Sequence, residues 1–400
     1  MPPWLLLIFL IFLISGPEFA TDMYVPSLPS IATSLHILKS SAALTITAYL
    51  LGMAISQFFY GSISDAYGRK KTLLISSLVC LAGNIICMVS HHFATLVVGR
   101  VIQGAGAGAS VSMCLAIARD VYEGPTLARA FSILFAFYFA VFGCAPIVGG
   151  YLEHYLNWRY NFVILTIYFA IQFFWVLLIY QETYVNTGTH QRLSLKTSLL
   201  NYWQLIKSRI FVGNLLACTL TYCGLFAYIA ITPFLFQKEM GLNAVEYGWL
   251  GIFIAAALVT ANVVGGQLVK KFGMHKPNFV LASAVIIGSV VMFVLALVGF
   301  SNVWVVILPF SVFILGIGMS GVTCAANAFT PFGHIAGSAG AFWTGMQFLI
   351  LFGTSFVFAH LGAKTQLPFS VTLMILAGSV VLCLLWVIPI KKLGTQTEDA

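Results

Sequence analysis

The chain has 400 residues, of which 60% are hydrophobic and only 8% are charged. Soluble proteins carry about 25% charged residues, so this composition excludes an ordinary soluble protein. The net charge of +8 comes from scattered basic residues with no basic run longer than three, so it gives no reason to expect a nucleic-acid partner.

Most of the chain consists of apolar segments of about 20 residues, each long enough to cross the roughly 30 Å of hydrocarbon in a bilayer. In lipid such segments must be helical, because a helix satisfies its own backbone hydrogen bonds. We therefore predict an all-α membrane protein with twelve spans. The predicted spans are 4–26, 41–61, 72–90, 94–118, 127–151, 160–180, 211–236, 244–269, 278–300, 303–328, 335–360 and 368–390.

The longest polar stretch divides these spans into two sets of six. We expect residues 1–180 to form an N-terminal six-helix bundle and residues 211–390 a C-terminal one. Residues 181–210 are the predicted cytoplasmic connector, with a short surface helix at 202–206, and residues 391–400 are the predicted cytoplasmic tail.

The first predicted span contains two acids, Glu18 and Asp22, in an otherwise uncharged segment. Residues four apart share one face of a helix. A carboxylate at the centre of a bilayer helix costs roughly 2.5–3.5 kcal/mol, so buried acids of this kind mark proton or cation sites. The two acids are therefore the first candidate for the functional site.

The loop after the second span reads GSISDAYGRKK over residues 61–71. Gly61 and Gly68 allow helix ends and a tight turn to approach closely. Asp65 can hold Arg69 or the N-terminus of a neighbouring helix. We interpret the loop as part of a gate.

An internal repeat supports the division into two halves. Gly266 and Gly273 follow Gly61 and Gly68 at an offset of 205 residues, with Lys270 where the first copy has Asp65. Both copies fall on the same predicted side of the membrane. This favours a parallel duplication with the substrate route between the halves.

The distribution of basic residues predicts that both termini are cytoplasmic, because cytoplasmic loops carry an excess of Lys and Arg. Four basic residues fall in outer loops, namely Lys39, Arg159, Lys238 and Lys364. Fourteen fall in cytoplasmic loops or the tail: Arg69, Lys70, Lys71, Arg119, Arg129, Arg192, Lys196, Lys207, Arg209, Lys270, Lys271, Lys276, Lys391 and Lys392.

The fourth predicted span contains a lone cation, Arg100, with Gln103 one turn further on a similar face. A cation in hydrocarbon needs a carboxylate or several oxygens around it. Arg100 can tie helices together, take part in transport, or do both. Glycines at 104, 106 and 108 permit close helix contact.

The fifth predicted span contains Pro146 flanked by glycines at 143, 149 and 150. A proline removes one backbone hydrogen bond, so the helix can bend there, and the glycines permit tight packing. The segment is either a kinked packing helix or a part of the transport machinery.

These motifs resemble those of the major facilitator superfamily. Residues 61–71 match its loop between helices 2 and 3, and Arg100 with Gln103 matches its helix 4 motif. The Pro146 segment is similar to its antiporter motif, with Ala145 in place of a glycine. With residues 20–32, the Arg119–Asp120 pair and residues 157–162, the chain resembles the Bcr/CflA-type drug-resistance exporters most densely over residues 20–184.

The resemblance implies exchange of a lipophilic drug or metabolite, which can be cationic, for protons across the bacterial inner membrane by alternating access. Because each chain contains both halves, we expect a monomer. The resemblance also implies that Asp22 carries the proton and that Arg100 is linked to proton transfer. Glu18 lies outside the family pattern and remains a second titrating acid, a partner for a cationic substrate, or a cavity-lining residue. An importer of a nutrient, siderophore or metabolite on the same fold is the alternative.

Two groups of residues complete the expected site. The expected gating residues are Gly61, Asp65, Gly68, Arg69, Arg119, Asp120 and Pro146. Lipophilic substrates need binding sites with apolar and aromatic walls and few polar groups. The expected substrate-binding residues are Tyr24, Tyr49, Gln103, Tyr138, Phe142, Phe226, Trp343 and Gln347. The aromatic members can equally be core or lipid-facing residues.

The sequence has no P-loop and no HExxH pattern. We therefore expect no ATP, no metal site, no cofactor and no enzymatic reaction, and a proton gradient as the energy source.

Overall fold

The structure, a computed structural model, describes residues 2–183, 195–273, 275–360 and 365–387. Within these ranges twelve helical segments are long and apolar enough to cross a membrane, and no strand is present. The predicted all-helical architecture with twelve spans is confirmed.

The helices of the first half are α1 Pro3–Asp22, α2 Leu28–Ser34, α3 Lys39–Tyr67, α4 Arg69–Met88, α5 Phe93–Val121, α6 Gly124–Tyr155 and α7 Arg159–Leu178, with the short 3-10 helix η1 Val25–Ser27 between α1 and α2. The helices that follow are α8 Leu195–Lys207, α9 Arg209–Phe234, α10 Ala244–Phe272, α11 His275–Leu297, α12 Val303–Phe329, α13 Ala336–His360 and α14 Leu367–Val387, with η2 Leu235–Glu239 and η3 Thr330–Ile335.

Several helices extend past the apolar segments that predicted them. The helix α3 continues through Gly61 to Tyr67, so Gly61 lies inside a helix and not at its end, and a Cβ added there would meet nothing within 4 Å. The turn falls at Gly68, whose φ of +89° favours glycine. Hydropathy marks where the apolar surface ends, whereas a helix can continue into the polar region beyond it.

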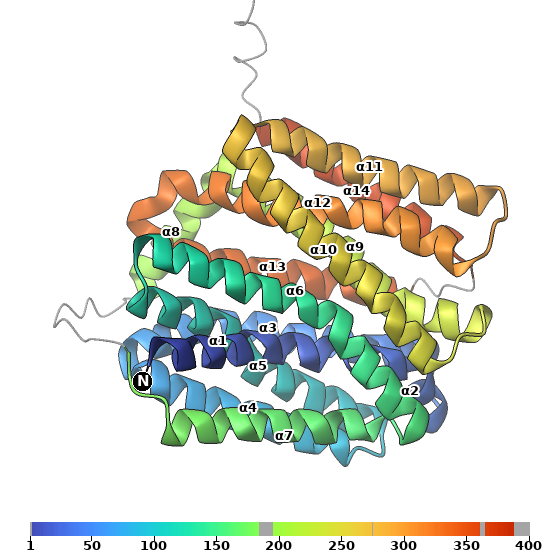
Figure 1. Cartoon of the computed structure of the whole chain (residues 1–400), viewed down its shortest axis with the longest axis horizontal. Coiled ribbons are helices and arrows are strands. Elements are labelled where there is room, and N and C mark those ends of the chain that lie inside the picture. Colours follow the sequence, from blue (N-terminus) through green and yellow to red (C-terminus); the bar gives the residue numbers. More distant parts are fainter. Residues whose placement is uncertain (1, 184–194, 274, 361–364, 388–400) are drawn as a thin grey trace, which may run out of the picture.

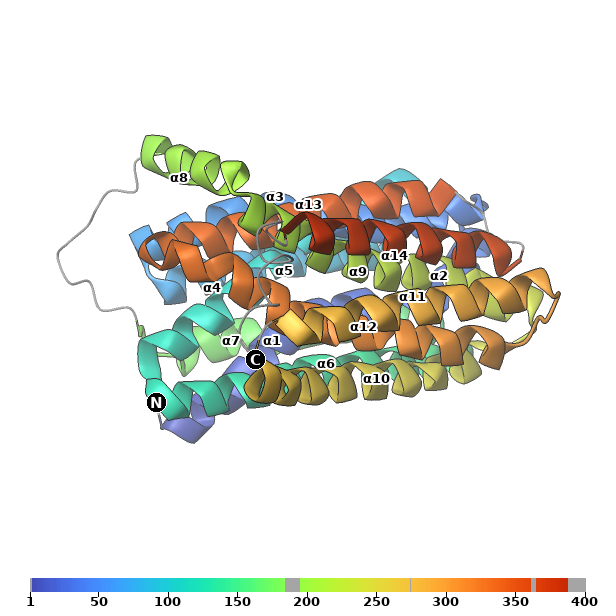
Figure 2. The same cartoon turned by 90° about the horizontal axis from the view of Figure 1, so that it is seen from above.

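The spans run side by side in two stacked sets (Figures 1 and 2). The helices α1 and α3–α7 form one set and α9–α14 the other, and the sets meet where α6 packs along α10 and α3 along α13. The boundaries predicted for the two bundles stay a prediction. The short helix α8 packs on α13 and α9 and includes the surface helix expected at 202–206.

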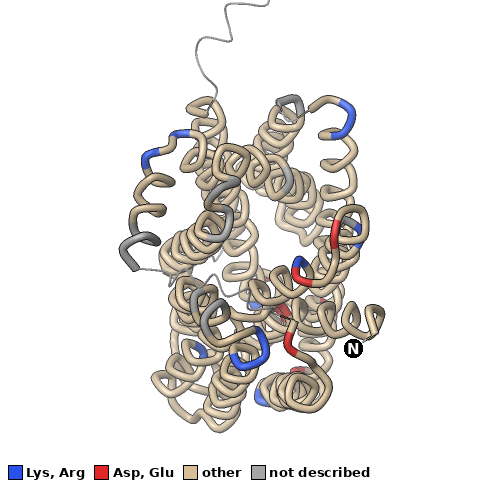
Figure 3. The backbone as a smooth tube through the Cα atoms, turned by 90° about the vertical axis from the view of Figure 1, so that its left-hand side faces the viewer, with Lys and Arg blue, Asp and Glu red and all other residues tan. Residues whose placement is uncertain are grey.

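We call one end of the molecule the basic end, because Arg69, Arg119, Lys207 and Lys270 lie at helix ends there. Figure 3 looks onto this end and shows Lys and Arg spread over it. The N-terminus lies at the same end (Figure 1). We call the other end the far end.

Polar contacts and small residues join the two sets toward the far end. Lys39 Nζ lies 3.0 Å from Glu239 Oε1, and Gln237 Nε2 donates to the Pro26 carbonyl at 2.9 Å. The α-carbon of Gly150 packs so closely on α10 that an added Cβ would lie 2.3 Å from the Ala244 carbonyl oxygen. The sets are therefore closed against each other at this end.

Of the glycines in the described ranges, Gly149 is the one at which an added Cβ would come closest to another atom. A Cβ there would lie 1.8 Å from the Met23 carbonyl oxygen, next to Asp22. We expect Gly149→Ala to destabilise the protein by about 1–3 kcal/mol or more, because α1 must move away from α6. The measurement is the thermal midpoint of the purified protein. The matched control is Gly378→Ala, where nothing lies within 4 Å of the added Cβ; an equal midpoint for both variants would contradict the prediction.

Candidate functional site

The two acids of α1 point into the protein. Only 8% of Glu18 and 3% of Asp22 is exposed. They are one helical turn apart and close enough for their charges to interact. The Tyr138 hydroxyl on α6 is positioned to hydrogen-bond to the Glu18 carboxyl group. Among the described residues, no group hydrogen-bonds to Asp22 Oδ2, which is buried.

Local sequence places these acids at the end of a helix. Pro17 lies inside α1, and its carbonyl accepts hydrogen bonds from the hydroxyls of Thr21 and Tyr49 at 3.0 Å each. The helix ends at Asp22, and the chain continues as η1, which contains Pro26 and therefore lacks one backbone donor. Asp22 thus lies where the regular helix stops.

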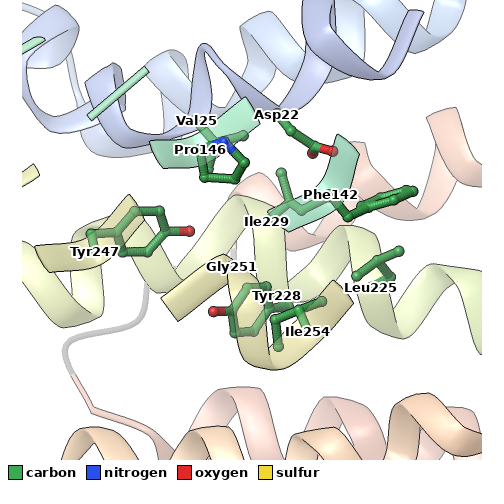
Figure 4. A pocket seen from close by; sticks show the side chains of 10 residues that line it. All are labelled: Asp22, Val25, Phe142, Pro146, Leu225, Tyr228, Ile229, Tyr247, Gly251 and Ile254. Carbon is green, nitrogen blue, oxygen red and sulfur yellow. The ribbon is translucent and has the colours of Figure 1, made fainter. Parts of the chain in front are cut away.

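Asp22 lines a cavity of about 30 Å³ between the two sets of helices (Figure 4). From its own set it is joined by Val25, Phe142 and Pro146. The opposite set contributes Leu225, Tyr228 and Ile229 from α9, and Tyr247, Gly251 and Ile254 from α10. The carboxyl group therefore faces helices of the other half across a largely apolar space.

The cavity is large enough for about one water molecule. Pockets for drug-sized ligands measure about 300–1,000 Å³. This conformation is therefore too closed at Asp22 to hold such a ligand, and any larger molecule requires that α6 and α10 separate.

Arg100 is fully buried and is held by oxygen atoms. Its Nη1 donates to the Ala20 carbonyl at 2.9 Å and to Gln103 Oε1 at 2.5 Å, and its Nε donates to the Thr45 carbonyl at 3.3 Å. Within the described ranges no carboxylate lies at ion-pair distance from it, and Nη2 has no hydrogen-bond partner. The sequence predicts either a carboxylate or several oxygens around this cation, and the structure shows several oxygens.

Two aromatic rings and an amide complete the surroundings of the guanidinium. Its central carbon lies 4.7 Å from the centre of the Tyr24 ring and 4.4 Å from that of Tyr49, distances typical of cation–π contacts. Gln103 Nε2 in turn donates to Asn84 Oδ1 at 2.7 Å. The orientation of Arg100 is therefore fixed from α1, α3, α4 and α5.

A second polar cluster lies at the basic end. Arg69 Nε lies 3.1 Å from Asp120 Oδ2. The backbone N–H groups of Arg69 and Lys70 donate to the two oxygens of Glu182, each at 3.0 Å. A carboxylate at a helix N-terminus is stabilising because it meets unpaired donors and the positive end of the helix dipole. Glu182 thus links the chain after α7 to the start of α4.

The comparison with known proteins decides the family. The family model described as Major Facilitator Superfamily matches residues 7–354. The chain belongs to the major facilitator superfamily.

Named relatives agree with this assignment and with the resemblance predicted from the motifs. The chain is 32% identical over 362 residues to the transporter YdgK of Bacillus subtilis, covering 89% of this chain and 88% of the relative. It is 27% identical to multidrug resistance protein D of Escherichia coli, covering 86% and 85% of the two chains. The expectation of a transporter rather than an enzyme is confirmed.

Solved structures confirm the fold of this superfamily. A D-xylose–proton symporter matches with a TM-score of 0.73 at 17% identity, over 96% of this chain and 97% of that chain. An inward-open structure of the Escherichia coli xylose transporter XylE matches equally well, with a TM-score of 0.73 at 17% identity, over 95% and 94% of the chains.

The residues expected to bind substrate are distributed over several environments. Phe142 lines the Asp22 cavity, and Tyr138 lies beside Glu18. Tyr24, Tyr49 and Gln103 surround Arg100, and they do not line the cavity.

The three candidates from the second half also lie away from this cavity. Trp343 packs against Phe211 and Phe329, with ring centres 5.8 and 5.4 Å apart. Phe226 is buried and Gln347 is half-buried, and neither lines the cavity. Their role in substrate binding stays a prediction.

The expected gating residues separate into three groups. Gly68, Arg69 and Asp120 meet in the basic-end cluster, whereas Pro146 lines the cavity. Arg119 is exposed and donates to a carbonyl of its own helix.

The side chain of Asp65, which the sequence paired with Arg69, lies outside the described part of the structure. The described contacts of Arg69 lie within the first half. A latch between the two halves therefore stays a prediction.

Sequence reasoning missed several residues of these clusters. Asn84 could have been noticed as a lone amide in the apolar segment of α4. Tyr228 and Tyr247 are two of many aromatic residues, and nothing in the sequence separates them from the rest. Glu182 acts on a helix that begins 113 residues earlier, so its partner is visible only in the fold.

Glu182→Gln tests the link to α4. We expect a loss of about 1 kcal/mol of stability, because the amide keeps one acceptor oxygen but loses the charge that favours the helix N-terminus. Thermal midpoints of the purified proteins measure it. Glu123→Gln serves as the comparison: Glu123 is the exposed N-cap residue of α6 and its side chain makes no hydrogen bond to that helix, so this variant loses only the charge effect and should lower the midpoint less.

Proposed function

We propose that this protein exports lipophilic small molecules across the bacterial inner membrane in exchange for protons, working as a monomer by alternating access. Family membership supports transport, and the relative named multidrug resistance protein D supports drugs as substrates. The motif around Pro146 supports antiport. The proposed proton carrier is Asp22, with Glu18 and Arg100 acting on it.

The observation that carries the proposal is the position of Asp22 between the halves. Its Oδ2 has no hydrogen-bond partner among the described residues, and the cavity that it lines is mostly apolar. Burying an unpaired carboxylate is costly. A proton or a cationic substrate can each remove this cost. The two therefore compete for one group, and competition of this kind yields exchange.

Arg100 is a second partner that the same site offers to Asp22. Its Nη2 is unpaired within the described part of the chain, and its Nη1 donates to Ala20, which lies between the two acids in α1. We propose that, in another conformation, Arg100 stabilises the charged form of Asp22 after the proton has left. The proton gradient then gives direction, since moving one charge is worth about 2.3 kcal/mol per 100 mV.

We propose that the basic end faces the cytoplasm, as the positive-inside rule favours. In that orientation the molecule is closed toward the outside, where Lys39 pairs with Glu239. Substrate would then enter from the cytoplasmic side as α6 and α10 separate.

The test is a panel of lipophilic compounds, cationic and neutral, in a host that lacks its own efflux pumps. Expression should lower accumulation of some compounds, and a protonophore should abolish the effect. Vesicles with the pH gradient imposed in either direction give the sign of coupling. Uptake of substrate together with protons would overturn export by antiport, and transport insensitive to the protonophore would overturn proton coupling.

A further inference from the structure

The seam between α6 and α10 is closed at the far end and open at the basic end. Toward the far end, a Cβ on Gly248 would lie 2.5 Å from the Pro146 carbonyl oxygen. Toward the basic end the same two helices enclose a groove of about 450 Å³. Its apolar walls are Phe131, Phe135 and Phe139 of α6 and Val259 and Val263 of α10.

The other interface between the halves, where α3 packs along α13, is in close contact at Phe58. There the Phe58 ring of α3 packs on Gly345 of α13, so that a Cβ on Gly345 would lie 2.5 Å from it. The opening between α6 and α10 is a wedge, because the two helices are in close contact over residues 142–150 and 244–255 and diverge toward the basic end.

The groove is open at the molecular surface of two membrane-spanning helices. Phe135 is 39% exposed and Val263 is 55% exposed. An empty apolar space deprives its walls of packing partners on one side. A flexible acyl chain can fill such a space from the bilayer.

The end of the groove nearest the basic end is polar and positively charged. Gln267 and Lys270 line it, and Lys270 lies in the last turn of α10. Within the described ranges Lys270 has no carboxylate at ion-pair distance. A basic residue beside a gap between membrane helices is suited to an anionic lipid headgroup.

We propose that this groove binds an anionic phospholipid from the leaflet at the basic end, with an acyl chain between α6 and α10 and the phosphate at Lys270. Because the lipid fits only while the two helices are apart, it stabilises this conformation over one in which the basic end closes. Binding of the lipid does not depend on the proposed substrate or on proton coupling.

The first experiment detects the acyl chain in the groove. Phe135→Trp adds a fluorophore to the groove wall, and Phe137→Trp adds one to the same helix at a side chain that is 50% exposed and lies outside the groove. Both variants are placed in nanodiscs with phosphatidylglycerol or phosphatidylcholine brominated on the acyl chains, and the signal of the unsubstituted protein is subtracted. Quenching in Phe135→Trp should reach half its maximum at a several-fold lower fraction of phosphatidylglycerol than of phosphatidylcholine. Phe137→Trp should show no such preference.

The second experiment tests the headgroup contact without a reporter in the groove. Lys270→Gln and Lys271→Gln remove the same charge from adjacent positions, and only Lys270 lines the groove. Native mass spectrometry of the purified protein titrated with phosphatidylglycerol should show about fivefold weaker binding for Lys270→Gln. Lys271→Gln should bind as the unsubstituted protein does.

Three outcomes would overturn the proposal. Equal effects of the two lysine variants would mean that the lipid responds only to general surface charge. Equal quenching by both lipids would mean that any acyl chain enters and that the anionic head is not recognised. Absence of quenching in Phe135→Trp would mean that lipid does not fill the groove. Unchanged thermal midpoints of the lysine variants verify that both fold.

Discussion

Asp22→Asn is expected to abolish proton-driven efflux while leaving a folded, membrane-inserted protein. The amide has nearly the same shape as the carboxyl group, and Asp22 Oδ2 has no partner to lose among the described residues. The amide cannot carry a proton or offer a negative charge to a cationic substrate. We expect coupled efflux to fall about 100-fold or more, which corresponds to at least about 2.7 kcal/mol. Efflux from vesicles with an imposed pH gradient measures it.

Companion variants separate the role of Asp22 from that of any acid. Asp22→Glu keeps the titrating group but lengthens it in a cavity of about 30 Å³, so we expect partial activity. Glu123→Gln removes an exposed acid at the basic end and should be neutral. Glu18→Gln, measured beside Asp22→Asn, shows whether Glu18 also titrates. If Asp22→Asn cells keep undiminished resistance and their vesicles full coupling, Asp22 is not part of the mechanism.

The hydropathy of the chain was enough to predict the spans, because a membrane demands that each crossing segment be an apolar helix. Local spacing also predicted contacts within one helix. Arg100 and Gln103, three residues apart, are hydrogen-bonded, and the glycines of α5 lie against neighbouring backbone as expected. These features depend on helix geometry alone, which is the same in every protein.

Contacts between helices were harder to predict. Whether Asp22 lies between the halves depends on how α1 is rotated about its axis. The spacing of Glu18 and Asp22 shows only that the two acids share one face of the helix. Tyr24 and Tyr49 show the same limit, since Tyr24 lies just after α1 and Tyr49 lies in α3, yet both pack around Arg100. Small differences in helix rotation decide whether an aromatic residue meets a ligand, a cation or another helix.

The groove at the basic end had no signal in the sequence. Phe131, Phe135 and Phe139 repeat every four residues, a pattern typical of any apolar helix face. The opening arises because α6 and α10 touch through glycines at one end and carry large side chains at the other. Only the packing of two distant segments reveals that difference.

Arg100 permits a test that separates tying helices together from acting as a charge. Arg100→Lys keeps the positive charge but replaces a planar group of five donors by a single ammonium. Arg100→Gln removes the charge but keeps an amide that can donate to Gln103 Oε1 or to the Ala20 carbonyl. Each variant loses some of the three hydrogen bonds that Arg100 makes. We therefore expect both to lose about 1–3 kcal/mol of stability, measured as lowered thermal midpoints.

Transport should distinguish the two variants even though their stabilities fall alike. If the charge of Arg100 stabilises ionised Asp22 during the cycle, Arg100→Lys keeps part of the coupled efflux and Arg100→Gln keeps almost none. If Arg100 only ties helices together, efflux follows the thermal midpoints, and the two variants are equally active at a temperature where both are folded. Efflux of Arg100→Gln equal to that of Arg100→Lys, measured in vesicles well below both midpoints, would therefore assign Arg100 a purely structural role and leave Asp22 to work with Glu18 alone.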